Sequence, residues 1–198
     1  MSGDVAVFLD RDGTISEEVG YVNHLDRLWL LPGVAEAIQL LNDQRIRTVV
    51  ATNQSGVARG YFPETLVRQV HERLEQLLKE QGARLDGIYY CPHHPRDGHP
   101  PYRQECACRK PKPGMLEQAA RDLGLDLEWC YTVGDRFADV ECGKRVGGTG
   151  ILVLTGYGKG EWLYGAGQAS TRPDFVATDL LEAANWICRD LRRRGWRG

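Results

Sequence analysis

Short apolar segments alternate with helix-like segments along this chain, and that alternation constrains the fold more than any other feature of the sequence. The segments predicted to be strands are 5–10, 48–53, 87–92, 130–135 and 150–156. They are rich in β-branched and aromatic residues, and the stretches between them place apolar residues on one helical face. Because strands that are apolar on both faces need helices on both sides, we predict a three-layer α/β/α fold around a parallel sheet.

One domain is predicted over residues 1–198, because this length suits a single well-packed core and no linker or internal repeat interrupts it. The space between the first two predicted strands allows one helix, so no large cap domain is expected. Residues 157–172 are predicted to be a loop. A last helix is predicted to begin at a cap, Thr178 or Asp179, and to run into an arginine-rich tail.

Composition excludes several classes of function. The formal net charge is −2, which gives no broad basic surface for nucleic acid or an anionic membrane. No apolar run approaches the roughly 20 residues of a membrane span, and the first apolar run, VAVFL, is too short for a signal peptide. No long apolar stripe demands a partner. We therefore expect a cytoplasmic monomer that binds neither nucleic acid nor membrane.

Polar residues end three of the predicted strands, at Asp10, Thr52 and Asp135. In parallel sheets, ligands bind beyond the carboxyl ends of the strands. Asp12 follows Asp10 by two residues, so both side chains can face the same side. Two carboxylates this close repel each other unless a cation lies between them, and oxygen ligands suit Mg²⁺. The sequence therefore predicts an acidic metal site at this edge of the sheet.

Two further features extend this site. Asp139 follows Asp135 by about one helical turn, and either Lys110 or Lys112 can supply a positive charge. Each residue alone is weak evidence, because Asp-Gly turns and capping aspartates are common. Their joint order is more specific: a carboxylate pair, a hydroxyl, a lysine and a carboxylate indicate an acidic metal site beside donors for a phosphate.

Cysteine and histidine are concentrated in the proline-rich segment 91–114, which is too short to be a domain. Cysteines of a cytoplasmic protein stay reduced, so metal binding or packing is expected rather than a disulfide framework. Cys91, Cys106 and Cys108, with His93 or alternatively His94 or His99, offer four ligands suited to tetrahedral Zn²⁺. A site with four protein ligands has no open position, which predicts a structural role. The remaining three cysteines are predicted to be small buried residues.

Four motifs carry a family resemblance: DRDGT, TNQSG, RKPKPG and GDRFAD resemble those of the haloacid dehalogenase (HAD) superfamily of phosphatases. Within that superfamily, FLDRDGTI, TNQSGVARGYF, DGIYYCPHHP and CACRKPKPGML are similar to the D-glycero-D-manno-heptose 1,7-bisphosphate 7-phosphatase family. The resemblance covers about residues 5–155. It implies a Rossmann-like fold, an aspartate nucleophile and a zinc-binding loop over residues 91–110.

The resemblance also implies catalytic roles. Asp10 is expected to attack phosphorus and form an aspartyl-phosphate, while Asp12 acts as general acid and then general base. Mg²⁺ is expected on the carboxylates of Asp10 and Asp135 and on the main-chain carbonyl of Asp12. Thr52 and Lys110 are expected to stabilise the transferred phosphoryl group.

Substrate contacts and the zinc ligands follow from the same resemblance. The residues implied to bind substrate are Glu18, Val19, Gly20, Tyr21, Asn53, Gln54, Ser55, Arg109 and Arg136. Arg109 is expected to hold a second phosphate or the sugar, whereas Arg136 stands where many relatives have lysine. The implied fourth zinc ligand is His93. Lys112 is then expected on the surface, Asp139 beside the metal without ligating it, and His24 and His71 on a loop and a helix surface.

The implied activity is removal of the C7 phosphate of D-glycero-D-manno-heptose 1,7-bisphosphate, a soluble sugar phosphate, in nucleotide-activated heptose synthesis for lipopolysaccharide or other surface glycans. A histidinol-phosphate phosphatase is the main alternative, although that subfamily has a shorter zinc loop and departs from TNQSGVARG. An open cleft also allows a polynucleotide phosphatase, which the net charge of −2 disfavours. A non-catalytic, zinc-stabilised binding module is a further alternative, and it would not need Asp10.

Overall fold

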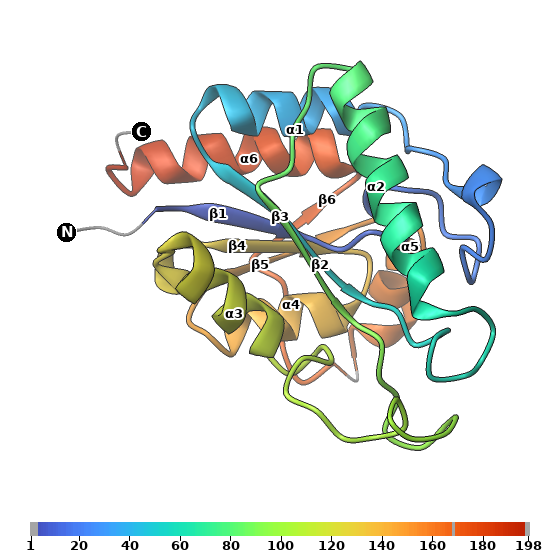
Figure 1. The fold of residues 1–198 in the computed structure, drawn as a ribbon. Helices are drawn as coiled ribbons and strands as arrows, with labels where there is room; N and C mark the ends of the chain where they lie inside the picture. Colours follow the sequence, from blue (N-terminus) through green and yellow to red (C-terminus); the bar gives the residue numbers. More distant parts are fainter. Residues whose placement is uncertain (1–3, 168, 197–198) are drawn as a thin grey trace.

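The fold is built on one parallel sheet of six strands in the order β3-β2-β1-β4-β5-β6 (Figure 1). The computed structural model describes residues 4–167 and 169–196. The strands are β1 (Ala6–Leu9), β2 (Arg47–Asn53), β3 (Gly87–Cys91), β4 (Tyr131–Gly134), β5 (Thr149–Val153) and β6 (Phe175–Ala177). From β1 the chain winds outward through β2 and β3, then returns to β4 on the other side of β1. The strand order therefore reverses at β1, which is where such folds bind ligands.

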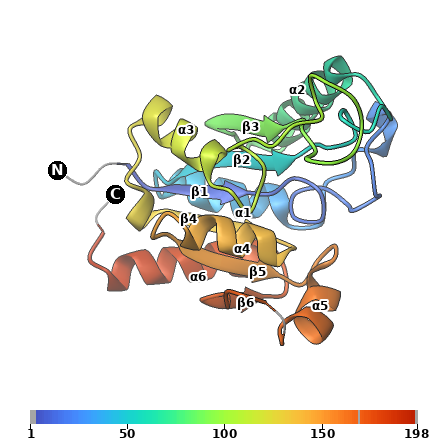
Figure 2. The same ribbon diagram turned by 90° about the horizontal axis from the view of Figure 1, so that it is seen from below.

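Helices cover both faces of the sheet, as predicted. They are α1 (Val34–Asp43), α2 (Glu64–Glu80), α3 (Gly114–Leu123), α4 (Phe137–Lys144), α5 (Gly158–Gly160) and α6 (Leu180–Arg193). One apolar core lies between the sheet and α1, α2 and α6, and a second lies between the sheet and α3 and α4 (Figure 2). β1 contributes to both, with Val7 and Leu9 in the first and Ala6 and Phe8 in the second. This division follows from the two-residue period of a strand.

Two predictions about the second half of the chain were wrong. The sixth strand, β6, was missed because it is three residues long and lies at the sheet edge, too short to form an apolar run. Residues 157–172 are not simply a loop, because α5 continues into a π-helical turn over Glu161–Gly165. Residue 168 of that segment and the end of the arginine-rich tail, 197–198, lie outside the described residues. Asp179, one of the two residues predicted to cap the last helix, is the N-cap of α6.

The connections at the carboxyl ends of the strands are long loops, with 3₁₀ turns at Leu25–Arg27 and, at the opposite edge, Leu127–Trp129. In the described chain, no cap domain is inserted between β1 and α1, in agreement with the prediction. No helix among the described residues has the length and apolar character needed to cross a membrane.

Candidate active site

Asp10 and Thr52, the polar residues at the ends of β1 and β2, line one cleft of about 430 Å³. Asp135, at the end of β4, is not part of the lining, but a carboxylate oxygen of it lies within 4.8 Å of one of Asp10. Of the residues predicted to form the site, those that line the cleft are Asp10, Asp12, Glu18, Gly20, Tyr21, Thr52, Asn53, Ser55, Arg109, Lys110 and Arg136. Asp139 lines it too, and three residues that sequence reasoning did not select, Arg59, Ala138 and Tyr157, complete it. The loops after β1, β2 and β3 therefore each contribute to the cleft, as the parallel topology predicts.

Three carboxylates come together at this cleft, and of these Asp135 and Asp139 are buried whereas Asp10 is partly exposed. Asp10, Asp135 and Asp139 each offer an oxygen, and these oxygens lie within 4.8 Å of one another. Asp135 accepts a hydrogen bond at Oδ2 from the Tyr157 main-chain N–H (2.8 Å), whereas its buried Oδ1 has no partner among the described residues. Burial, with the Asp10 carboxylate nearby, raises the pKa of Asp135 to about 8. A buried, unpartnered carboxylate oxygen beside a second carboxylate is what a divalent cation with oxygen ligands would satisfy.

Lys110 forms ion pairs with both Asp10 and Asp139. Its Nζ lies 3.0 Å from Asp10 Oδ1 and 2.5 Å from Asp139 Oδ1, and it donates to the Ala51 carbonyl at 2.6 Å. Burial lowers the pKa of Lys110, but the two carboxylates outweigh this and raise it, so the ammonium stays charged. Both oxygens of Asp139 are engaged, Oδ1 by Lys110 and Oδ2 by the Arg136 N–H, whereas Lys110 meets only Oδ1 of Asp10 and Asp135 Oδ1 has no partner among the described residues, so Asp10 and Asp135 are the pair best placed to hold a metal. That Asp139 lies beside the metal without ligating it stays a prediction, because its oxygen also lies within 4.8 Å of those of Asp10 and Asp135.

Gly13 allows the first loop to pass close over Asp135. Its φ is +77°, and a Cβ at this position would lie 2.1 Å from Asp135 Oδ2. Any other residue would therefore be both strained and in collision with the carboxylate. The Thr155 hydroxyl, from the loop after β5, donates to the Gly13 carbonyl at 2.6 Å and holds this turn in place.

Asp12 is held by a buried arginine that sequence reasoning overlooked. Arg11 is 1% exposed, and its Nε and Nη2 donate to the two oxygens of Asp12 at 3.0 and 2.8 Å. Nη2 also donates to Gln54 Oε1 (2.9 Å), and Nη1 donates to His71 Nε2 (3.2 Å). Burial, with the charge of Arg11 nearby, lowers the pKa of His71 to about 3, so the imidazole is neutral and accepts this bond. This network orients the Asp12 carboxylate at the cleft wall.

Two residues of this network lie where the sequence analysis did not predict them. His71 was predicted on a helix surface but is 6% exposed. The apolar spacing of α2, in which Val67, Val70 and Leu74 are also buried, places position 71 on the buried stripe and could have revealed this. Gln54 was expected to contact substrate, yet it lies behind the cleft wall, where Nε2 donates to Asp12 Oδ2 at 2.9 Å and to Thr52 Oγ1 at 3.1 Å.

The loop after β1 forms one rim of the cleft. Glu18 and Tyr21 face the cleft, and the Tyr21 ring packs edge-to-face on Tyr61 with centroids 4.8 Å apart. Burial raises the pKa of Glu18, while its hydrogen bond from the Gly20 N–H opposes that rise. Val19 was expected among the substrate contacts, but its side chain packs against the main core instead.

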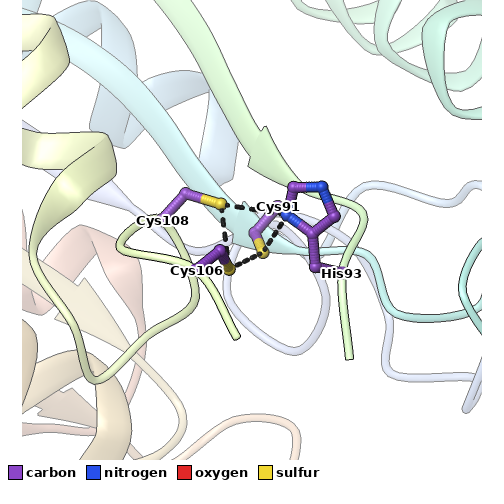
Figure 3. A group of neighbouring side chains, drawn as sticks. All are labelled: Cys91, His93, Cys106 and Cys108. Atoms are coloured by element: carbon purple, nitrogen blue, oxygen red, sulfur yellow. Dashed lines mark hydrogen bonds between the residues drawn. The ribbon is translucent and has the colours of Figure 1, made fainter. Parts of the chain in front are cut away.

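The four predicted zinc ligands come together in one cluster, as Figure 3 shows. Cys106 Sγ lies 3.5 Å from the sulfur of Cys91 and 3.3 Å from that of Cys108, and His93 Nδ1 lies 3.4 Å from Cys108 Sγ. These separations approach the edges of about 3.8 Å expected for a tetrahedron with zinc–sulfur bonds of about 2.3 Å. Its hydrogen bond with Cys108, together with burial, raises the pKa of Cys91. The donor set fits a closed, four-coordinate zinc site.

The neighbouring histidines have other partners. His94 accepts at Nδ1 from the Asp97 N–H (2.9 Å) and its Nε2 lies 3.3 Å from Arg59 Nη2, so it stands outside the ligand set. His99 likewise lies outside the cluster of four. Both histidines that were alternatives for the fourth zinc ligand, His94 and His99, are therefore disfavoured by the geometry.

Lys112 is exposed and pairs with Glu105 at 3.4 Å, as expected of a surface residue.

The last residue of the cysteine–histidine cluster is adjacent in sequence to two cationic residues of the cleft. Cys108 is followed by Arg109 and Lys110, and Arg109 Nη1 donates to the His93 carbonyl at 3.1 Å. Asn53, at the end of β2, binds the main chain of Lys110 twice, accepting from its N–H at 3.1 Å and donating to its carbonyl at 3.2 Å. The backbone that presents both cations is therefore held by the cluster on one side and by β2 on the other.

This strand order, with carboxylates, a hydroxyl and a buried lysine at the switch point, defines a phosphate-ester hydrolase of the HAD type. The family model described as HAD-hydrolase-like matches residues 107–183. D-glycero-D-manno-heptose-1,7-bisphosphate 7-phosphatase of Thermosynechococcus vestitus is 44% identical over 96% of this chain and 98% of its own length. D-glycero-beta-D-manno-heptose-1,7-bisphosphate 7-phosphatase of Haemophilus ducreyi is 47% identical over 93% of this chain and 99% of its own.

A solved structure gives the same result. The D,D-heptose 1,7-bisphosphate phosphatase from B. bronchiseptica, complexed with magnesium and phosphate, superposes with a TM-score of 0.82 at 33% identity, covering 94% of this chain and 99% of that chain. The chain belongs to the heptose 1,7-bisphosphate 7-phosphatase family, as its motifs predicted.

Proposed function

We propose that this protein removes the C7 phosphate of D-glycero-D-manno-heptose 1,7-bisphosphate, giving the heptose 1-phosphate for nucleotide-activated heptose synthesis. The observation that carries the proposal is a cleft that holds two separate sets of residues suited to binding phosphate. Asp10 and Lys110 line the cleft, with Asp135 within 4.8 Å of Asp10, and suit a reacting phosphate. Arg59, Arg109 and Arg136 also line it and suit a second anionic group. The near full-length relatives named for this activity support the same substrate.

In the proposed reaction, Asp10 is the nucleophile. The Arg11 main-chain N–H (2.8 Å) and the Lys110 ammonium (3.0 Å) both engage Asp10 Oδ1, which leaves Oδ2 for attack on phosphorus. The new Oδ2–P bond forms as the bond from phosphorus to the sugar oxygen breaks. Asp12, oriented by Arg11, donates a proton to the leaving oxygen. Asp12 then takes a proton from the water that attacks phosphorus and releases inorganic phosphate and the Asp10 carboxylate.

The negative charge of the transferred phosphoryl group is proposed to be stabilised by two donors of the cleft. These are the Lys110 ammonium and the Thr52 hydroxyl, which are proposed to hold the phosphoryl oxygens. The residues proposed to hold Mg²⁺ are Asp10 and Asp135, with the Asp12 carbonyl. When bound, the ion would neutralise the repulsion between carboxylate and phosphate and fix the phosphoryl group in line.

Zn²⁺ is proposed on Cys91, His93, Cys106 and Cys108, as a structural clip for the 91–110 loop. Structural zinc sites contribute roughly 10–16 kcal/mol of binding free energy, which is ample to order a loop of this length.

We further propose that residues 1–198 form one domain, acting as a cytoplasmic monomer on a soluble sugar phosphate, with no nucleic-acid partner. Light scattering on the purified protein tests the oligomeric state.

A panel of phosphate esters tests the substrate assignment. The panel holds the α- and β-anomers of the heptose 1,7-bisphosphate, heptose 7-phosphate, histidinol phosphate and a 5′-phosphorylated oligonucleotide. The proposal expects the highest kcat/KM for one of the heptose bisphosphates. A higher kcat/KM for histidinol phosphate or for the oligonucleotide would overturn it, and so would phosphate release from C1 instead of C7.

A further inference from the structure

Four cationic side chains line the cleft, and three of them have partners in the protein. Lys110 is held by two carboxylates of the cleft floor. Arg59 is paired with Asp97 at 2.5 Å. Arg109 donates to a main-chain carbonyl at 3.1 Å. The fourth, Arg136, has no carboxylate within ion-pair distance in the described parts of the chain, so its guanidinium is available to a ligand.

What holds Arg136 is an aromatic ring. Its backbone is fixed at the start of α4, where its main-chain N–H donates to Asp139 Oδ2 at 3.1 Å. Its guanidinium carbon lies over the ring of Tyr157, 3.9 Å from the ring centroid. A guanidinium that stacks on a ring by its face keeps its N–H groups in its own plane, where they remain open to other partners. The ring therefore restricts where Arg136 points without using up the groups that bind oxyanions.

The main chain of Tyr157 is hydrogen-bonded to a carboxylate of the proposed active site. Its main-chain N–H donates to Asp135 Oδ2, and the preceding loop is tied to the first strand loop through Thr155 and Gly13. The next residue, Gly158, is buried, and a Cβ there would lie 1.7 Å from the Val153 carbonyl. The Tyr157 ring, 42% exposed, forms part of the cleft lining. These contacts fix the backbone from which the Tyr157 ring projects.

The geometry points to Tyr157 as a positioning residue that determines specificity: its ring holds Arg136 at the cleft wall, where Arg136 binds an anionic group on the part of the substrate that is not transferred. This inference rests on the proposed bisphosphate substrate, whose second phosphate is such a group. A planar, always charged guanidinium can form two parallel bonds with a phosphate, and a stacked partner lowers the entropy lost in forming them.

The experiment compares two substrates that differ in this group, heptose 1,7-bisphosphate and heptose 7-phosphate. Tyr157→Ala should lower kcat/KM for the bisphosphate by roughly 5- to 20-fold, mainly through KM, as expected for a cation–π contact at a partly exposed site. The loss on the monophosphate should be several-fold smaller. Tyr157→Phe keeps the ring face and should restore most of the loss. Tyr164→Ala, on the same segment with an 83% exposed side chain, is the matched control and should not change the substrate ratio.

A double-mutant cycle separates positioning from direct contact. If Tyr157 acts through Arg136, the Arg136→Ala/Tyr157→Ala variant should be no worse on the bisphosphate than Arg136→Ala alone. Additive losses, or equal losses on both substrates, would overturn the inference and leave Tyr157 with a purely structural role. A wild-type enzyme that does not favour the bisphosphate refutes the proposed function before any variant is made. A wild-type preference that Tyr157→Ala leaves unchanged refutes only this inference.

Discussion

Replacing Lys110 with methionine should destabilise the folded protein more than any exposed substitution, quite apart from its effect on turnover. The Lys110 side chain is buried between Asp10 and Asp139, whose carboxylates lie 3.0 and 2.5 Å from its Nζ. Asp139 is itself buried, and its second oxygen is engaged by the Arg136 N–H. Methionine preserves much of the volume of the side chain but removes the charge that compensates both carboxylates.

The expected cost is about 3–5 kcal/mol, the usual penalty for leaving one member of a buried ion pair without its partner. With an m value of about 2–3 kcal/mol per molar urea for a domain of this size, the unfolding midpoint should fall by roughly 1–2 M. Lys112→Met is the matched control. That lysine lies two residues along the same loop, is half-exposed and has a surface partner, so it should cost no more than about 0.5 kcal/mol.

The deficit should depend on pH in a defined direction. Burial raises the pKa of Asp139, and the Lys110 ammonium opposes that rise. Removing the ammonium therefore moves the pKa of Asp139 further above its value in the unfolded chain. A carboxyl group with a raised folded pKa destabilises the protein fully above that pKa, and the penalty fades as pH falls through it. Urea unfolding of Lys110→Met without added Mg²⁺ should therefore show a larger deficit at pH 8 than at pH 5.

A second substitution distinguishes charge from packing. Lys110→Met/Asp139→Asn removes the uncompensated charge and keeps an oxygen to accept from the Arg136 N–H, so it should recover at least half of the lost stability. Turnover should stay lost, because no ammonium remains to meet the phosphate. A single variant as stable as wild type at pH 8, or a double variant no more stable than the single, would refute this account of Lys110.

Three further results are expected. Asp10→Asn should lower turnover by roughly 10⁴-fold or more while circular dichroism and zinc content stay unchanged; an active variant would exclude Asp10 as nucleophile. His71→Leu leaves a buried guanidinium donor of Arg11 without an acceptor and should cost about 1–3 kcal/mol in a thermal melt, and His71→Gln should recover part of it; equal melts for wild type and both variants would count against this bond. Stripping Zn²⁺ should expose residues 91–110 to protease and abolish turnover, whereas withdrawing Mg²⁺ should stop turnover reversibly with the loop still protected. An active, protected, zinc-free protein would contradict the clip.

Much of the site was predictable because it depends on local patterns that topology converts into proximity. Asp10, Thr52 and Asp135 each end an apolar strand, and parallel strands bring their carboxyl ends to one edge. The spacing of Cys91 and His93, then of Cys106 and Cys108, predicted a ligand set that the structure brings together. These signals could be read without knowing any tertiary contact, since strand period and ligand chemistry are properties of short segments.

Other features depended on side-chain packing between distant segments. Gln54 was predicted to face the cleft because its neighbours do, yet it turns behind Asp12, since Arg11 offers its amide oxygen a buried donor. The three residues of β6 form a strand only because β5 offers them an edge. No sequence pattern distinguishes these outcomes, because each is selected by a partner that becomes available on folding.

The sequence by itself determined the parallel sheet, the acidic strand ends, the cysteine and histidine residues of the cluster and the family, because apolar periodicity and residue chemistry act over a few residues. Only the tertiary structure decided how the cations are shared. It paired Arg59 with Asp97, buried Lys110 between two carboxylates and laid Arg136 on Tyr157. These segments lie far apart in the chain, and which charge compensates which depends on distances of a few ångströms that exist only after the strands have assembled.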